Sequence, residues 1–446
     1  MVKWSMETEE QEEQEEQLSQ RDIIRMYSKY VCKPKAEFFK NLGLGVVQDK
    51  RRGMYLYTLE GRRKNDPPLE LINCRTSGGV FNLGHQNPQM IRALQEGIEM
   101  GLDIGDHHMI SKQRALLARD LAELFPGNLS KTQYCVGGGE AVDLALKMAR
   151  AFTHRTKIIS AKRSYHGVTG LAMAAGNERF RTPYSGELPE FQKVPFGDTE
   201  TIVKAIDEQT AAVILETIPA TGGILIAPPG YLTAIRKRCD EVGALYIADE
   251  VQAGLGRTGE MWGIYGGIYP DELMIPDIIV LGKGMSAGIY PMATCSYRPE
   301  LESIFEEDPF IHISTTGGSE LGCYITRKML KIISRPEFLE NVRIRGKQLQ
   351  EGLLHLQALR PDIITEIRGR GLMWAIEFNA DRLGVGYTLY MIENGVFADY
   401  CGNNEKTIKL MPPLNVTEAD ITEIVRRLAI ALDKIPKITS VAEDSP

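Results

Sequence analysis

Four short apolar runs, each followed at once by polar or glycine-rich residues, constrain the fold of this chain more than any other feature. The runs are 157–161 (KIISA), 212–217 (AVILET), 244–248 (ALYIA) and 278–281 (IIVL). Between them apolar residues recur at helical spacing, and this alternation is typical of a parallel sheet wound with helices. Ligand sites in such sheets form where the strands end. The polar residues that follow the runs are therefore the first candidates for function.

The 446 residues are enough for more than one structural domain. The alternating pattern predicts a large α/β catalytic domain over residues 71–325. Residues 326–436 are rich in helical patterns and should form a smaller α+β domain together with residues 21–70. Residues 1–20 contain a long Glu/Gln run and are predicted to be an acidic, solvated tail, with a second tail at 437–446.

Composition favours small-molecule chemistry. The formal net charge is -7, from 52 basic and 59 acidic side chains, and without a basic cluster nucleic-acid binding is not expected. The seven cysteines are dispersed without CxxC pairs, which is typical of reduced thiols in a cytoplasmic protein. Apolar runs are too short to span a bilayer, and the amino terminus has no export signal. We therefore expect a cytoplasmic protein without membrane or metal sites.

Two ionisable residues stand directly after two of the apolar runs. Asp249 follows 245–248 and Lys283 follows 278–282, so both should project from the carboxyl ends of buried strands. A lysine desolvated there has a lowered pKa, which suits it to condense with an aldehyde and then to shuttle a proton. An aspartate nearby can keep a pyridine nitrogen protonated, so that the ring accepts electrons. Taken singly, each residue is more readily explained as an ordinary solvated loop residue, and the surrounding sequence changes that interpretation.

The surrounding sequence resembles the class III, or omega-type, aminotransferases, a branch of the fold type I enzymes that use pyridoxal 5'-phosphate (PLP). The resemblance extends from about residue 39 to residue 432 and is strongest at 244–259 (ALYIADEVQAGLGRTG) and 276–292 (PDIIVLGKGMSAGIYPM). It implies a large domain with a mixed, mostly parallel sheet and a smaller α+β domain built from both termini. It also implies that Lys283 forms a Schiff base with PLP, that Asp249 binds the pyridine nitrogen, and that Gln252 lies near the ring hydroxyl.

Residues 134–149 (YCVGGGEAVDLALKMA) read as a strand end, three glycines and an amphipathic helix. Backbone amides at a helix amino terminus attract a phosphate, and glycines let it come close. A tight turn without a ligand would explain the glycines equally well, and a P-loop is excluded because no Gly-Lys-Ser/Thr follows. The family pattern here resembles Asn-Ser-Gly-Thr-Glu-Ala, with hydroxyl groups that this chain lacks. Phosphate binding is therefore expected to rest on the amides of Gly138 and Gly139.

Two further motifs extend the resemblance. The family's Tyr-His-Gly is matched at 165–167, where Tyr165 would stack on the pyridine ring; a core tyrosine is the alternative. The segment 312–323 (HISTTGGSELGC) resembles Thr-Phe-Gly-Gly-Asn-Pro, whose threonine reaches the cofactor phosphate of the neighbouring subunit, and Thr315 takes that position. The resemblance thus implies a homodimer, or a dimer of dimers, with shared active sites.

On the substrate side the chain departs from its family. Glu216 is retained in ETIPATGG, where relatives read Glu-Pro-Ile-Gln-Gly and the glutamate lines the substrate pocket and can pair with an arginine; a surface glutamate is the alternative. Lys409, in TIKLMPPLNVT, stands where relatives carry the arginine that grips a substrate carboxylate. A lysine offers one mobile ammonium instead of a planar clamp. Arg368 matches a family position and either ties the small domain together or touches substrate.

These features predict a PLP-dependent aminotransferase that moves an amino group from an amine or amino acid to a 2-oxo acid. Racemases, epimerases and decarboxylases of the same family share the cofactor residues, so these reactions stay open as alternatives. The lysine at position 409, which replaces the family's carboxylate-binding arginine, supports these alternatives. A non-catalytic interaction protein on an enzyme fold is a second alternative, which the intact Lys283 and Asp249 disfavour.

Overall fold

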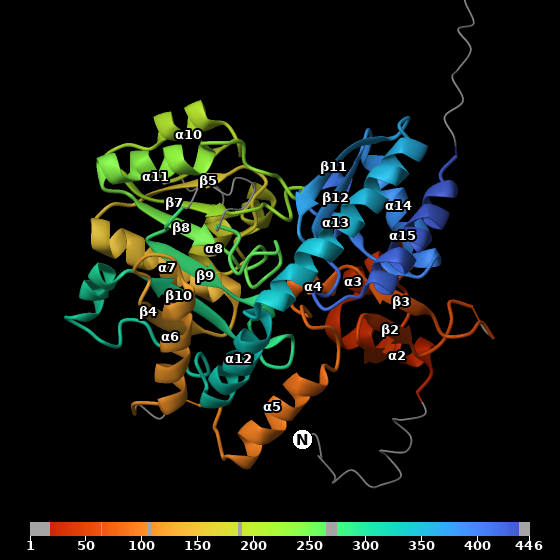
Figure 1. The fold of residues 1–446 in the computed structure, drawn as a ribbon, viewed down its shortest axis with the longest axis horizontal. Coiled ribbons are helices and arrows are strands. Elements are labelled where there is room, and N and C mark those ends of the chain that lie inside the picture. The colour runs from red at the N-terminus through yellow and green to blue at the C-terminus, as the bar shows by residue number, and fades with distance from the viewer. Residues whose placement is uncertain (1–17, 64, 106–108, 186–189, 265–273, 437–446) are drawn as a thin grey trace, which may run out of the picture.

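The computed structural model describes residues 18–63, 65–105, 109–185, 190–264 and 274–436. Within them the chain forms two lobes, one around a large sheet and one around two smaller sheets (Figure 1). The predicted tail at 437–446 and most of the predicted tail at 1–20 lie outside the described residues. Ser19 and Gln20 differ from that prediction, because Ser19 caps helix α2 (Gln20–Tyr27) and Gln20 is buried.

The large sheet has seven strands, and β10 alone runs antiparallel to its neighbours. In spatial order they are β4 (Lys131–Cys135), β10 (Ala293–Tyr297), β9 (Ile278–Leu281), β8 (Leu245–Asp249), β7 (Thr210–Glu216), β5 (Lys157–Ala161) and β6 (Phe191–Val194). The predicted runs 157–161 and 278–281 coincide with β5 and β9, and the other two end within one residue of the observed strands. The predicted α/β class with a mixed, mostly parallel sheet is confirmed.

Side chains of successive strand residues pack into two separate apolar cores, one on each face of the large sheet. In β7, Val213 and Leu215 belong to one apolar cluster, whereas Ala212 and Ile214 belong to the other. Both faces are covered, so the strand is apolar from Ala211 to Leu215 and does not alternate. One core packs against α7 (Gly138–Thr153) and α8 (Gly170–Ala175). The other packs against α6 (Lys112–Leu124), α10 (Thr199–Ala205), α11 (Tyr231–Val242) and α12 (Glu320–Ile333).

The second lobe combines both ends of the chain. One sheet has the order β1 (Gln48–Arg52), β2 (Tyr55–Thr58), β3 (Glu70–Asn73) and β13 (Val396–Phe397). The other has the order β11 (Ile364–Arg370), β12 (Met373–Phe378), β15 (Asn404–Leu410) and β14 (Asp399–Cys401). Because β3 pairs with β13, residues more than three hundred positions apart share one sheet, and red and blue segments lie together in Figure 1.

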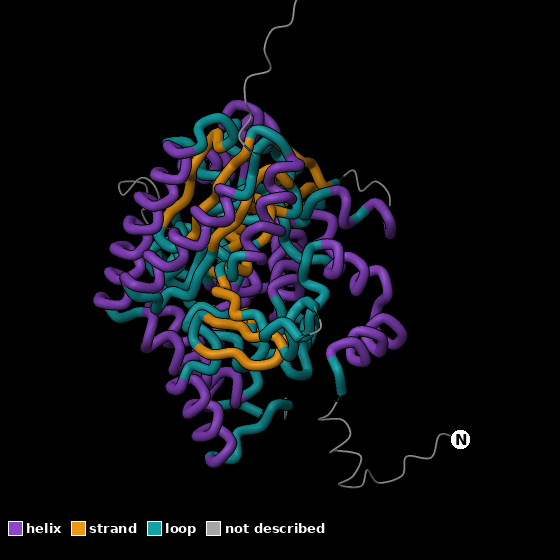
Figure 2. The backbone as a smooth tube through the Cα atoms, turned by 90° about the vertical axis from the view of Figure 1, so that its right-hand side faces the viewer, coloured by secondary structure: helices purple, strands orange, loops and turns teal. Residues whose placement is uncertain are grey.

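Helices cover this lobe, which faces the viewer in Figure 2. The long helices are α13 (Pro336–Leu359), α14 (Asp381–Glu393) and α15 (Glu418–Asp433). The remaining helical elements are a π-helix η1 (Ser28–Cys32), α3 (Lys33–Asn41), α4 (Thr76–Gly79), α5 (Pro88–Glu99), η2 (Glu178–Phe180), α9 (Thr182–Ser185), η3 (Lys283–Ser286) and η4 (Pro299–Phe305). No helix in the described part of the chain is long and apolar enough to cross a membrane.

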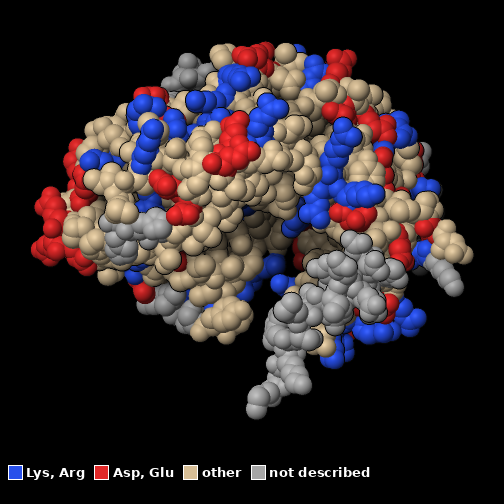
Figure 3. All heavy atoms as spheres, turned by 90° about the horizontal axis from the view of Figure 1, so that it is seen from below, with Lys and Arg blue, Asp and Glu red and all other residues tan. Residues whose placement is uncertain are grey.

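Two buried arginines join the lobes. Arg257, 2% exposed, donates to the carbonyl oxygens of Leu372 and Pro412. Arg368 donates from Nε to the carbonyl of Gly223 at 2.8 Å and pairs with Glu377. Each guanidinium thus satisfies backbone acceptors across the lobe boundary. Seen from below, the molecular surface is hollowed near its middle, and Lys and Arg side chains gather around the hollow (Figure 3).

Two helical glycines of the small lobe allow a matched test of this packing. A Cβ at Gly346 of α13 would lie 2.2 Å from the carbonyl oxygen of Gly371, whereas a Cβ at Gly386 of α14 meets nothing within 4 Å. We expect Gly346→Ala to lower the free energy of unfolding by about 2 kcal/mol because helix and turn must separate. Gly386→Ala should raise it by up to about 1 kcal/mol through helix propensity. Urea unfolding midpoints that move in the same direction would contradict this packing.

Candidate active site

The carboxyl ends of three neighbouring parallel strands meet at one cavity. Glu216 ends β7 and lies opposite Asp249, which ends β8, and Asp249 lies opposite Val280 of β9, three residues before Lys283. The cavity measures about 180 Å³. It is lined by Gly138, Gly139, Tyr165, His166, Gly167, Glu216, Asp249, Val251, Gln252 and Lys283. All the site residues predicted from the sequence, except Thr315 and Lys409, are among them.

Lys283 begins the short helix η3, and its surroundings make its side-chain amine less basic than that of an ordinary lysine. Desolvation lowers the pKa of its ammonium, the carboxylates of Asp249 and Glu216 oppose this, and the Lys409 ammonium adds to it. Its φ of +44° lies in the left-handed region, which is strained for a residue with a side chain. A lysine with a lowered pKa has more of the neutral amine that attacks a carbonyl.

Asp249 is fixed by two hydrogen bonds. Its Oδ2 accepts from Nδ1 of His166 at 2.7 Å, and its Oδ1 accepts from the backbone N–H of Val251 at 3.1 Å. The His166 side chain is fully buried, and its Nε2 has no hydrogen-bond partner among the described residues. Sequence reasoning gave His166 no role, although it stands inside the Tyr-His-Gly motif. The structure shows that it orients the carboxylate that was predicted to face a pyridine nitrogen.

The glycine-rich turn before α7 has the shape of an anion cradle. Helix α7 begins at Gly138, and its N-cap Gly137 supplies no side chain, so the first amides have no partner within the helix. Backbone segments approach closely here: a Cβ at Gly167 would lie 2.6 Å from the Cα of Gly139, and one at Gly139 would lie 2.8 Å from Oγ1 of Thr169. The cradle therefore fits a phosphate group, and it does so with backbone donors.

A segment that sequence reasoning missed packs against the lysine and against Gln252. In α4, a Cβ at Gly78 would lie 2.9 Å from Oε1 of Gln252 and 3.1 Å from Cε of Lys283. Ser77 and Gly78 both have positive φ, so the turn is tightly bent where it covers the lysine. The positive φ at a glycine was the available signal, but no local pattern connects residue 78 with residue 283. Tyr165, which lines the cavity, packs edge-on against Phe180, with ring centroids 5.2 Å apart.

Glu216 is buried at 4% exposure, so it is not the surface glutamate considered as an alternative. Its Oε1 accepts from the backbone N–H of Tyr165 at 2.8 Å, and its Oε2 accepts from that of Ala220 at 3.3 Å. Burial raises the pKa of Glu216 to about 7, Asp249 adds to the rise, and His166 opposes it. Both oxygens are thus engaged by backbone groups of the loops that flank the cavity.

Lys409 and Thr315 lie outside the lining of this cavity. Lys409 is in β15, and its ammonium lies 4.0 Å from Oδ1 of Asp399. Thr315 is exposed in the loop between η4 and α12. Its expected role requires a second subunit and stays a prediction.

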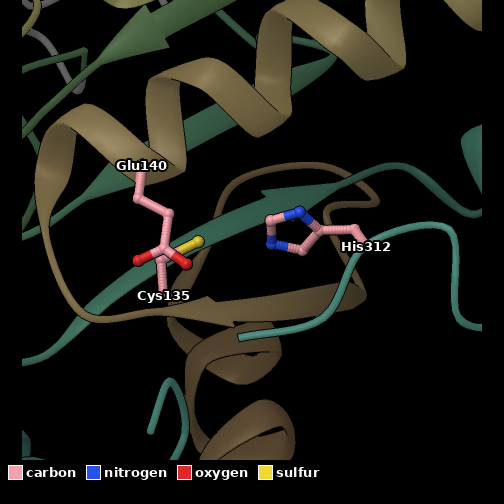
Figure 4. Close-up of side chains that lie close together, drawn as sticks. All are labelled: Cys135, Glu140 and His312. Carbon is pink, nitrogen blue, oxygen red and sulfur yellow. The ribbon is translucent and has the colours of Figure 1, made fainter. Parts of the chain in front are cut away.

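One group of described residues combines three metal-ligand types beside the cradle. Cys135, Glu140 and His312 place ligand atoms within 4.8 Å of one another (Figure 4). The Lys147 ammonium donates to Nδ1 of His312 at 3.3 Å, and the backbone N–H of Val136 donates to Glu140. Burial raises the pKa of the Cys135 thiol. A protonated thiol and a neighbouring ammonium both disfavour a cation, so the expectation of no metal site is kept as a prediction.

Comparisons with known proteins agree with this geometry. The family model "Aminotransferase class-III" matches residues 40–432. An uncharacterized aminotransferase of Archaeoglobus fulgidus is 45% identical over 412 residues, which are 92% of this chain and 94% of that protein. The ornithine aminotransferase of Toxoplasma gondii has the same fold, with a TM-score of 0.83 and 24% identity over 96% of this chain and 98% of that one. An omega transaminase of Pseudomonas jessenii in complex with PMP gives a TM-score of 0.79 and 26% identity over 89% and 94%.

The cradle can be tested by a pair of glycine substitutions. Gly167→Ala places a Cβ against the backbone of Gly139, at a φ of +117°, and should displace the amides that face the phosphate. We expect the affinity for PLP to fall by at least about tenfold, the loss of one charge-assisted hydrogen bond. Gly137→Ala is the control, because its Cβ meets nothing within 4 Å. PLP titration followed by absorbance measures both, and equal affinities in the two variants would exclude a tightly packed cradle.

Proposed function

This chain belongs to the class III aminotransferases, whose reaction is PLP-dependent amino-group transfer, and we propose that Lys283 and Asp249 carry this reaction. The proposal rests above all on one observation. A desolvated lysine, a fixed aspartate and a glycine-lined helix amino terminus open into the same cavity. When bound, PLP supplies an aldehyde for an amine and a ring that withdraws electrons from the substrate carbon. The donor is an amine or amino acid, and the acceptor is a 2-oxo acid.

Each residue has a defined task. Lys283 Nζ would hold the cofactor and would move a proton at the substrate carbon. Asp249, held by His166 and by the amide of Val251, would accept a hydrogen bond from a protonated ring nitrogen. The amides of Gly138 and Gly139 would bind the phosphate. Tyr165 and Gln252 would hold the ring.

The support for transfer over the alternative reactions comes from the relatives. The similar proteins are named as aminotransferases or transaminases, and one of them is in complex with PMP, which supports the cofactor proposed here. Nothing in these comparisons favours racemisation, decarboxylation or a non-catalytic role. The cytoplasmic location stays a prediction.

Replacement of Lys283 tests the catalytic assignment. Lys283→Ala, and Lys283→Arg as the variant that keeps the charge, should fold and bind the phosphate but lose the absorbance band of the lysine-linked cofactor. We expect amino transfer to fall by at least about 10³-fold in both, since attachment and proton transfer depend on the same amine. The measurement is the absorbance spectrum with PLP and carbonyl production from a panel of amino acids and diamines with pyruvate or 2-oxoglutarate. An unchanged band in Lys283→Ala would refute the assignment, and wild-type turnover without a carbonyl product would point to epimerisation or decarboxylation.

We also propose that the active form is a homodimer, or a dimer of dimers. Large apolar side chains are exposed on two segments whose following residues meet, because Ser111 is hydrogen-bonded to Glu320 and Arg114 to Gly318. They are Ile98, Met100, Ile104, Met109 and Ile110 on one segment and Phe310, Ile311 and Ile313 on the other. This surface, called here the apolar loop surface, fits a second copy of the chain. Thr315 lies next to it and would reach the partner's cradle.

The dimer is testable with a charge on the apolar loop surface. Ile110 is fully exposed in the single chain, so Ile110→Glu should leave the fold intact and weaken the dimer by at least about tenfold, through the burial of an unpaired charge. Leu354→Glu, on the exposed face of α13, is the matched control. Analytical ultracentrifugation over a dilution series gives the dissociation constants. A monomeric wild type, or equal effects of both substitutions, would contradict the proposed interface.

A further inference from the structure

The turn between β14 and β15 connects the small lobe to two segments of the large lobe. Residues 402–403 form this turn, which is called here the small-lobe turn. The backbone N–H of Asn403 donates to the carbonyl oxygen of Thr221 at 3.1 Å, in the segment that follows β7. The carbonyl oxygen of Gly402 accepts from Nη1 of Arg179 in η2. The small-lobe turn is therefore a contact point between the lobes.

The Asn403 side chain extends this contact to a third segment of the large lobe. Its Nδ2 donates to the carbonyl oxygen of Arg163 at 2.8 Å and to that of Ser164 at 3.3 Å. These two carbonyl groups directly precede Tyr165, which lines the cavity. Arg163 has a φ of +63°, so the chain is strained here and contacts from outside the segment have to hold it. Asn403 supplies two of these contacts.

The peptide group that joins Ser164 to Tyr165 is held at both ends. Its carbonyl oxygen accepts from Nδ2 of Asn403 and from the backbone N–H of Asn177, the latter at 2.9 Å. Its N–H donates to Oε1 of Glu216 at 2.8 Å. Because a peptide group is planar, fixing both ends also fixes the direction in which the next side chain leaves the backbone. The direction of the Tyr165 side chain thus depends in part on a residue of the small lobe.

The small-lobe turn reaches the Tyr165 ring by a second route. Arg179, which donates to Gly402, has its guanidinium 4.9 Å from the centre of the Phe180 ring. Phe180 in turn packs edge-on against the ring of Tyr165. The turn therefore contacts residues that hold both the backbone and the ring of Tyr165.

The amide group of Asn403 is not explained by the stability of the turn alone. Its Oδ1 is buried and accepts no hydrogen bond from a described residue. A buried acceptor without a partner destabilises a fold, and an apolar side chain would not have this cost. The two hydrogen bonds from Nδ2 offset it, and both are made to the residues next to Tyr165 and not within the turn.

We propose that Asn403 is a positioning residue of the amino-transfer site, which holds the Tyr165 ring in place for the cofactor through the peptide group that precedes it. The small lobe thereby acts on a cavity whose lining residues belong to the large lobe. A change at residue 403 acts on cofactor binding only through Tyr165. The inference rests on the proposed function, because it concerns the cofactor ring that Tyr165 would hold.

The first test uses the protein without cofactor. Asn403→Asp keeps the shape of the side chain but places an oxygen against two carbonyl oxygens, so the residues around Tyr165 should loosen. Hydrogen exchange followed by mass spectrometry should be at least about fivefold faster in peptides that contain the Tyr165 amide. Exchange in β7 and β8 should stay unchanged, which separates local loosening from a lower global stability.

Asn394→Asp is the matched control for this test. Nδ2 of Asn394 donates to the carbonyl oxygen of Tyr390 at 2.8 Å, at the end of α14 in the same lobe. The control should leave exchange at Tyr165 at the wild-type rate. Unchanged exchange at Tyr165 in Asn403→Asp, or equal acceleration in both variants, overturns the inference.

The second test asks whether Asn403 acts through Tyr165. Absorbance titration should show that Asn403→Asp weakens PLP binding at least about fivefold when Tyr165 is present. In the Tyr165→Ala background the same substitution should change the affinity by less than about twofold. Asn403→Ala adds no charge and should show the same dependence on Tyr165, which excludes a purely electrostatic cause. If the effects of the two positions multiply, Asn403 acts by another route and the inference is overturned.

The two tests separate this inference from the proposed function. A wild type that binds PLP and transfers amino groups, with exchange at Tyr165 unaffected by Asn403→Asp, would overturn the inference and leave the proposed function intact. A wild type that neither binds PLP nor transfers amino groups would refute the proposed function. Faster exchange in Asn403→Asp would then still show that Asn403 holds Tyr165, because that measurement needs no cofactor.

Discussion

The parallel register of β7, β8 and β9 is the constraint on which the site depends. It brings Glu216, Asp249 and Lys283 to one edge of the sheet, with apolar strands beneath them. Charges buried together must be paired or shift their pKa, and both happen here. His166 bonds to Asp249, while desolvation lowers the pKa of Lys283 and raises that of Glu216. The lowered pKa of Lys283 thus results from its burial in the fold and not from any single neighbouring residue.

Sequence patterns predicted the parts of this arrangement that are local. Apolar runs located β5 and β9 residue by residue and placed Asp249 and Lys283 after the strands whose ends line the cavity, because a buried strand and its end have a local sequence pattern. The sequence did not predict the hydrogen-bond partners of the site residues. His166 is 83 positions from Asp249, and Asp399 is 324 positions from Arg75. Such contacts follow from how the lobes are wound together, and no periodicity encodes them.

The glycines of the cradle depart from the family pattern, and one of them is explained by backbone packing. Glycines stand at positions 137 and 139, where the family pattern has hydroxyl-bearing residues. The backbone of Gly167 passes so close to Gly139 that a Cβ at residue 167 would collide with it, whereas a Cβ at Gly137 would meet nothing within 4 Å. Glycine at position 139 therefore has a packing reason as well as the proposed phosphate-binding one.

The two lobes contribute unequally to the site. The residues that line the cavity belong to the large lobe, where strand ends of the large sheet hold Lys283 and Asp249 and helix α7 begins at the cradle. Lys409 and Asp399 lie opposite each other on β15 and β14 of the small lobe and outside this lining. Arg257 and Arg368 tie the lobes together through backbone carbonyls. The position of the small lobe relative to the large one is therefore fixed by contacts outside the cavity, because neither arginine belongs to the lining.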